Sequence, residues 1–186
     1  LSGATSLGTG ILSPVTENLN TGVRLSTAVA DNYGDIGSNA VDLSNSDSAS
    51  TTRGATGESS TAMGRGTTAS GDVSTAMGVF TTASGSRSTA MGRSTTASAS
   101  YSTAMGDETT ASGSRSTAMG YGTEASGYAS TAMGGGTEAS GYASTAMGES
   151  TTASDFGSTV IGQYNSSGST VTNSATVFNA ANTAFV

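Results

Sequence analysis

Carboxylates are the side chains through which this chain could do chemistry, because His and Cys are both absent from its 186 residues. Their absence excludes a catalytic imidazole, a Ser-His-Asp triad and the usual zinc sites. The adjacent Asp107-Glu108 has the residue types of an acid–base pair. It stands between two repeated motifs, however, where a solvated turn is expected. The sequence therefore predicts no catalytic residue and no enzyme.

A second group of carboxylates lies near the N-terminus, where Asn and Gly separate Asp31, Asp35, Asp42 and Asp47. Calcium prefers such oxygen ligands, but the spacing does not match an EF-hand loop. The many Gly-containing stretches do not open a helix, so they are not phosphate-binding loops. We predict neither a metal ion nor a cofactor.

The net charge and the hydrophobic pattern limit the kinds of partner that the chain can bind. The formal net charge is −7 and all six basic residues are Arg, so nothing attracts a phosphate backbone and nucleic-acid binding is not expected. No apolar run approaches 18 residues, so we expect no membrane insertion in this segment. The start at Leu1, without a basic leader, indicates a fragment or a processed form.

The dominant feature is a pentapeptide, Ser-Thr-Ala-Met-Gly, that recurs every 14 residues from Ser60 and ends in the variant Ser158–Gly162. All seven Met stand at its fourth position. A fixed period is the signature of a repeat architecture. A flexible Ser/Gly linker has a similar composition, but it has no reason to hold one register over eight units.

Each unit contains two halves of seven residues, because Thr-Thr-Ala-Ser-Gly follows each pentapeptide after two variable residues. Seven residues suit a five-residue strand and a tight turn, with Gly at the corner. We therefore predict an all-β fold, a parallel β-roll or solenoid with 14-residue coils stacked about 4.8 Å apart.

Strand alternation assigns each side chain to a face. Ser74 and Ala76 should point into a lumen too narrow for larger residues, and so should Thr81 and Ala83 of the second half. The slot of Thr82 must face solvent, because two later units place Glu124 and Glu138 there and a lone carboxylate is costly to bury.

The Met slot then also points outward, on the other sheet. An exposed apolar ladder of this length is unusual for a soluble monomer. We predict that other copies of the chain cover it, through an interface of Met63, Met77, Met91, Met105, Met119, Met133, Met147 and Ile161. The alternative is that Met fills a wider lumen within one chain.

We divide the chain into a lead-in or N-terminal cap (1–52), the repeat β-roll (53–162) and a C-terminal transition segment (163–186) that looks truncated. In the cap, residues 21–30 and the pair Val41 and Leu43 suggest strands. Beyond the roll, residues 170–172 and 175–178 also suggest strands.

Variation is confined to the two residues that follow each Gly. A rigid scaffold with variable turns is a common division between structure and recognition, although turns also simply tolerate change. The candidate ligand contacts are the large side chains in these turns, Phe80, Arg87, Tyr101, Arg115, Tyr121, Tyr128 and Tyr142.

The repeat resembles the head repeat of trimeric autotransporter adhesins, which runs Ser-Val-Ala-Ile-Gly followed by two variable residues. The likeness covers residues 53–162, with Thr in place of Val and Met in place of Ile. It implies a left-handed parallel β-roll, a homotrimer, and no catalytic residue or metal ligand in the Met slot. The lead-in also looks like phage-fibre-like repeat proteins of marine bacteria.

The leading functional hypothesis is an extracellular adhesin or receptor-binding fibre segment, on a cell surface or a virion. This trimeric rod would show its turn residues to a host-surface glycan or protein. One alternative is a structural spacer or filament subunit without its own ligand. Another is an ice-binding solenoid, because Thr68, Thr82 and Thr96 begin an outward Thr row that Glu124 and Glu138 interrupt.

Overall fold

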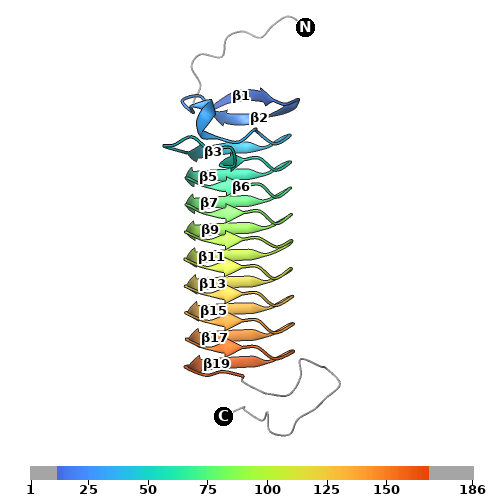
Figure 1. Ribbon diagram of the computed structural model, residues 1–186, viewed down its shortest axis with the longest axis vertical. Coiled ribbons are helices and arrows are strands. Elements are labelled where there is room, and N and C mark those ends of the chain that lie inside the picture. The colour runs from blue at the N-terminus through green and yellow to red at the C-terminus, as the bar shows by residue number, and fades with distance from the viewer. Residues whose placement is uncertain (1–11, 168–186) are drawn as a thin grey trace, which may run out of the picture.

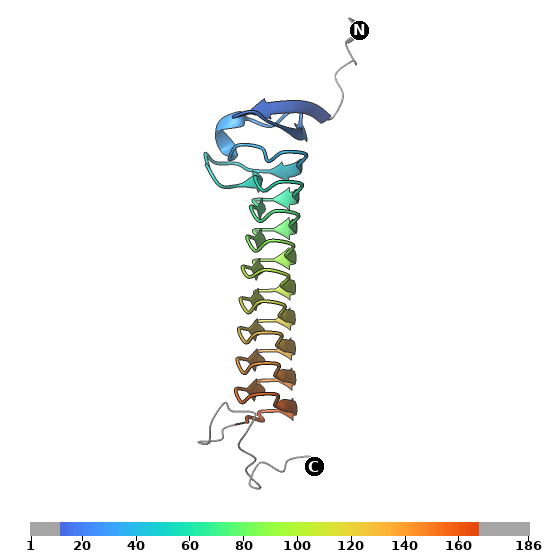
Figure 2. The same cartoon turned by 90° about the vertical axis from the view of Figure 1, so that its right-hand side faces the viewer.

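Each 14-residue unit folds into one coil, made of a long strand, a turn, a short strand and a second turn. The structure is a computed structural model that describes residues 12–167. The coils stack into a straight parallel β-solenoid (Figure 1). Seen from the side, the column is thin, with the two sheets back to back (Figure 2). The predicted all-β solenoid is confirmed.

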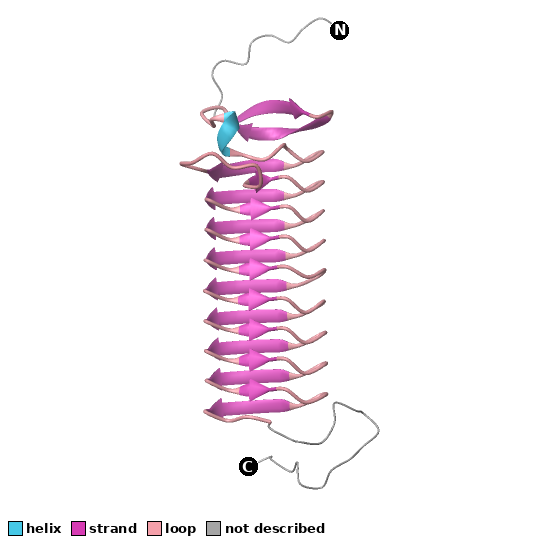
Figure 3. Ribbon diagram, in the orientation of Figure 1, coloured by secondary structure: helices cyan, strands magenta, loops and turns pink. Residues whose placement is uncertain are grey.

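Two sheets form the walls in the described residues. The long strands make an 11-stranded sheet of β1 (Leu12–Glu17), β2 (Asn20–Leu25), β3 (Val41–Asn45), β5 (Thr61–Arg65), β7 (Thr75–Val79), β9 (Thr89–Arg93), β11 (Thr103–Asp107), β13 (Thr117–Tyr121), β15 (Thr131–Gly135), β17 (Thr145–Glu149) and β19 (Thr159–Gln163). The short strands make an 8-stranded sheet of β4 (Gly54–Ala55), β6 (Thr68–Ala69), β8 (Thr82–Ala83), β10 (Thr96–Ala97), β12 (Thr110–Ala111), β14 (Glu124–Ala125), β16 (Glu138–Ala139) and β18 (Thr152–Ala153). The alternation of long and short strands is visible in Figure 3.

The short strands correct one expectation. Both halves of a unit were expected to form five-residue strands, but the second half contributes a strand of only two residues, Thr-Ala or Glu-Ala. The Ser and Gly that follow still bond to the next coil: the N–H groups of Ser84 and Gly85 both donate to the carbonyl of Ala97. The backbone turns at this shared acceptor, and the strand ends.

Identical residues stack on one another throughout the roll. Ala104 pairs with Ala118, and Met105 pairs with Met119, in parallel register. The same 14-residue step recurs from β5 to β19. Each residue therefore lies between its equivalents in the coils above and below, so that each position of the repeat forms a column of like side chains.

The lumen is filled by small side chains, and the predicted inward rows are confirmed. Ala76, Ala83, Ser74 and Thr81 and their equivalents are buried in every coil. Ser102 Oγ donates to the carbonyl of Ala99, three residues back, at 2.7 Å. Ser144 and Ser158 make the same bond, to the carbonyls of Gly141 and Asp155. The remaining buried Ser hydroxyls of this column and the buried Thr hydroxyls of the lumen have no partner among the described residues. The Ser hydroxyls without a partner can form the bond that Ser102 forms, by rotation about χ1.

Close stacking dictates both Gly columns. Gly106 has φ +125°, and a Cβ there would lie 2.0 Å from the carbonyl oxygen of Gly120. Gly113 has no positive φ, yet its Cβ would meet the oxygen of Gly127 at the same 2.0 Å. The expectation of Gly as a corner with positive φ therefore holds for the first column only. The second column is mostly Gly because stacking leaves almost no space for a side chain, although Ala99 and Asp155 also stand in it.

The N-terminal end of the column is closed by a hairpin. β1 pairs antiparallel with β2, which continues in parallel to β3. A single 3₁₀ turn, η1 (Ala30–Asn32), lies in the connection to β3. β3 pairs in turn with β5, so the ladder of the roll extends into the lead-in.

The strand suggested by Val41 and Leu43 is present as β3. Val41 and Leu43 share one face and stand in the outer Thr and Met columns, opposite Thr61 and Met63. Asp42 occupies the Ala column of the lumen and is fully buried. Arg24 follows it inside: its Nε lies 3.3 Å from Asp42 Oδ2 and its Nη1 lies 2.9 Å from Glu17 Oε1. A buried carboxylate is tolerated here because a buried guanidinium pairs with it.

The strands expected within residues 170–178, and the strand-like end at 182–186, lie outside the described residues.

Gly106→Ala tests whether coil stacking requires the first Gly column. The substitution should destabilise the roll by about 3 kcal/mol or more, because it adds backbone strain and a clash with the next coil. Thermal unfolding followed by circular dichroism measures the effect.

Gly122→Ala is the matched control. Gly122 has φ +58° with open space around a Cβ, and Ala129 and Ala143 adopt this conformation elsewhere. It should cost about 1–2 kcal/mol, the strain of the left-handed region alone, and therefore less than Gly106→Ala. Equal losses in both variants would contradict the stacking argument.

Candidate interaction surfaces

The outer face of the 11-stranded sheet carries the Met column. Met63 and Met77 are each 37% exposed and Ile161 is 53% exposed, while the other Met side chains are partly buried. A half-buried Thr column runs beside them, two residues earlier in each strand. Leu43 extends the Met column by one coil into the lead-in. The predicted outward position of Met is confirmed, and the alternative of a Met-filled lumen is wrong.

The outer face of the 8-stranded sheet is polar. Thr82, Thr96 and Thr110 form one column, which continues through Glu124 and Glu138 to Thr152. Both Glu side chains are exposed, as the sequence required. Because they are directly paired in register, two like charges face each other, which is unfavourable in a sheet. This face has no apolar column to bury.

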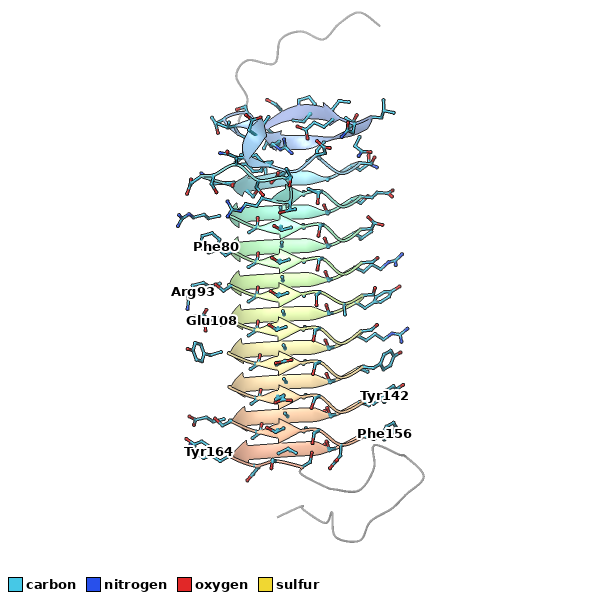
Figure 4. The ribbon with its side chains drawn as sticks, in the orientation of Figure 1. Phe80, Arg93, Glu108, Tyr142, Phe156 and Tyr164 are labelled. Carbon is cyan, nitrogen blue, oxygen red and sulfur yellow. The ribbon has the colours of Figure 1, made fainter. Side chains whose placement is uncertain are left out.

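The variable turns form the two edges of the column (Figure 4). One edge carries Phe80, Arg93, Glu108 and Tyr164 and is called here the Phe80 edge; the other carries Tyr142 and Phe156 and is called the Tyr142 edge. Each turn holds one residue in the left-handed region, such as Phe80 at φ 54° and Tyr101 at φ 61°. Bulky residues rarely adopt this conformation. The hydrogen bonds between coils impose it: Tyr101 N–H donates to the carbonyl of Ser86.

Charges on the Phe80 edge are paired with each other. Arg65 Nε lies 3.2 Å from Asp47 Oδ2, and its guanidinium lies over the Phe80 ring, 5.3 Å from the centroid. Arg93 Nη2 contacts Asp107 at 2.7 Å and Glu108 at 3.4 Å. The hydrogen bond that Arg93 donates to Asp107, and then the charge of Asp107, raise the pKa of the Arg93 guanidinium. Asp107 and Glu108 are thus ion-pair partners of Arg93.

The Tyr142 edge is a continuous stack. Tyr128 and Tyr142 stack with ring centroids 4.8 Å apart, and Tyr142 stacks on Phe156 at 5.2 Å. Arg115 bridges the coils above, with its guanidinium carbon 5.2 Å from the Tyr128 centroid and 5.9 Å from that of Tyr101. Arg87 covers Tyr101 at 5.4 Å. Six consecutive coils are therefore linked by π contacts along this edge.

The seven predicted contact residues divide between the edges. The Phe80 edge has Phe80 and Tyr121, and the Tyr142 edge has Arg87, Tyr101, Arg115, Tyr128 and Tyr142. Phe156 was missed, although it occupies the same turn position as Tyr142, 14 residues later. On the Tyr142 edge the ring faces meet neighbours in the same chain, so ring edges, hydroxyls and guanidinium N–H groups are what a ligand would meet.

Other kinds of site find little support in the part of the chain that the structure describes. No three His, Cys, Asp or Glu side chains gather there into a possible metal site. Two shallow hollows lie beside the N-terminal coils, one of them lined by Asn45, Asp47, Arg53 and Phe80. Neither is an enclosed cavity.

Within residues 12–167, no helix is both long and apolar enough to cross a membrane.

The repeat matches a known family. Four consecutive stretches, residues 55–81, 83–109, 111–137 and 139–165, fit the sequence model of the YadA head domain repeat (2 copies). Together they cover more than half of the chain, and each spans two coils. A search of curated proteins found no match.

Tyr142→Ser tests the stack on the Tyr142 edge. The variant loses both ring pairs of Tyr142, and each such pair contributes about 0.5–1.5 kcal/mol. Its free energy of unfolding should therefore fall measurably in thermal or urea denaturation. Tyr121→Ser is the control, because Tyr121 is an exposed turn Tyr in no ring stack that the structure describes. An equal change in the two variants would show that the stacking adds nothing to stability.

Proposed function

The chain belongs to the YadA head domain repeat family, and on that premise we propose that it is a segment of an extracellular, homotrimeric adhesin rod that attaches to surfaces. The Met column is the observation that carries this proposal. It is a straight apolar stripe on a chain whose other outer sheet face is polar.

Burial of this stripe gives a reason for assembly. Removing apolar surface from water contributes about 25 cal/mol per Å², and the gain is repeated in every coil. The family is trimeric in general, which favours three chains with their Met columns facing a common axis. Because all coils are alike, such chains would match Met against Met only when they are in register or shifted by whole coils.

Attachment would then use the two edges, where the sequence varies. A trimer shows three copies of each edge, and several weak contacts add to strong binding when they act together. The partner we propose is a glycan or protein of a host surface. Rings on the Tyr142 edge offer hydroxyls and edges to it, because their faces are already in contact with one another.

A structural spacer is the second candidate, and the same stack favours it. Rings and guanidiniums that bind each other from coil to coil stiffen a rod without any ligand. The ice-binding alternative has less support, because Glu124 and Glu138 break the Thr column of the polar face.

Met105→Asp should abolish the trimer, since it would place a carboxylate in the middle of an apolar interface. Native mass spectrometry of the 186-residue chain would then show monomers in place of trimers. Thr110→Asp is the control, because the polar face already accepts Glu in that column. A Met105→Asp protein that stays trimeric would rule out the Met column as the interface.

Attachment is tested with beads coated with the protein on immobilised matrix proteins, glycans and cell layers. Beads coated with the trimer should attach to at least one of these surfaces. In the same assay with soluble protein, where no bead supplies multivalency, Met105→Asp should lower binding about 100-fold or more through lost avidity. Thr110→Asp should bind like the unchanged protein. If the trimeric protein binds none of the surfaces, the spacer is the better assignment.

A further inference from the structure

The six arginines differ in what their side chains contact. Four are held by polar groups of the protein: Arg24 by Glu17 and Asp42, Arg53 by two Ser hydroxyls, Arg65 by Asp47, and Arg93 by Asp107 and Glu108. Arg87 and Arg115 have no carboxylate within 4.0 Å in the described part of the chain. Both belong to the Tyr142 edge, and both lie over the ring of Tyr101.

The ring contacts of these two guanidiniums leave most of their hydrogen-bond donors unused. A cation over a ring face is attracted to it without a hydrogen bond, and the N–H groups of a guanidinium lie in the plane of the group. Arg87 uses one donor, Nη1, on the Tyr101 hydroxyl at 3.1 Å. Among the described residues, no side-chain hydrogen bond of Arg115 is formed. The remaining donors keep the planar fork that binds carboxylates and sulfates with two parallel hydrogen bonds.

We propose that Arg87, Tyr101 and Arg115 form a binding site for an acidic polysaccharide, which would be held through its sulfate or carboxylate groups. This inference rests on the proposed adhesin function and names the ligand class of its Tyr142 edge. Arg87 and Arg115 are two coils apart, about 9.6 Å along the axis. That distance is close to the length of one disaccharide, so successive acidic sugars can each meet one guanidinium, with the Tyr101 hydroxyl between them.

The net charge of the rod opposes binding of any polyanion, so affinity for an acidic polysaccharide must come from the local contacts at this site. A net charge of −7 repels a densely charged polymer such as a nucleic acid duplex, which carries a phosphate charge about every 1.7 Å. An acidic polysaccharide needs only two of its groups at this site. The nearby Asp72 does not compete for Arg87, because its Oδ1 accepts the backbone N–H of Glu58 in the preceding coil at 3.2 Å.

The test compares two double variants of equal charge. Arg87→Gln/Arg115→Gln removes the proposed site, while Arg65→Gln/Arg93→Gln removes two arginines from the Phe80 edge. Binding of the full chain to dextran sulfate, polygalacturonate and uncharged dextran is measured by surface plasmon resonance, at low and at physiological salt. Sulfate and carboxylate preferences are separated by the first two polymers.

The unchanged protein should bind at least one charged polymer and not the uncharged dextran. Arg87→Gln/Arg115→Gln should weaken this binding about tenfold or more, and the control pair by less than about threefold. Arg87→Lys/Arg115→Lys keeps the charge without the fork, so its binding should fall between the two. Trimers in native mass spectrometry and a cooperative thermal transition show that each variant is folded, even where lost ring contacts or ion pairs lower its midpoint.

Two results would overturn the site: no binding of the unchanged protein to either charged polymer, or equal weakening by the two Gln pairs. Either result would leave the adhesin proposal standing if the coated beads still attach to a surface. Binding to dextran sulfate by a protein whose beads attach to no cell, matrix or glycan surface would support the site and reject the adhesin function.

Discussion

The whole structure depends on coils that lie one β-spacing apart and in register. At about 4.8 Å there is no room for a side chain between Gly106 and Gly120, or between Gly113 and Gly127. From the coil of Ala62 to that of Ala146 the narrow lumen holds only Ala, Ser and Thr, and the larger Asp42 and Val160 enter the Ala column only at its two ends. Between those ends, anything larger must point outward or sit in a turn. The low hydrophobicity of the chain is therefore a consequence of its geometry, and the apolar surface that remains is concentrated in the Met column.

Much of this was predictable, because a strict period turns each choice of residue into a column that one constraint explains. Glu124 and Glu138 identified the face of the short strands that points to solvent. Strand alternation then placed Ala76 in the lumen and Met77 on the outside. The two-residue second strand was not predictable, because it depends on Ala97 accepting two N–H groups at once. In β3 the alternation of Val41 and Leu43 indicated a strand, but only the register with β5 shows that Asp42 is the residue that points inside.

The contacts on the edges were also hidden from the sequence. Residues of the turns were identified as variable, but which of them touch depends on rotamers across coils. The stack passes from Tyr101 and Arg115, in the second position of their turns, to Tyr128 and Tyr142, in the first. That shift is visible only in space. The stacked aromatic faces stiffen the rod. Most hydrogen-bond donors of Arg87 and Arg115 on the same edge remain available to a ligand.

The cap has a consequence for the assembly of rods end to end. At the N-terminal end of the described column, β1 runs antiparallel to β2, and the lumen below is closed by Asp42 and Arg24. A second solenoid that approached this end would need a strand running parallel to its own coils and an Ala column to continue. It meets neither. A second solenoid therefore cannot continue the parallel ladder and the Ala column of the roll at this end of the described residues.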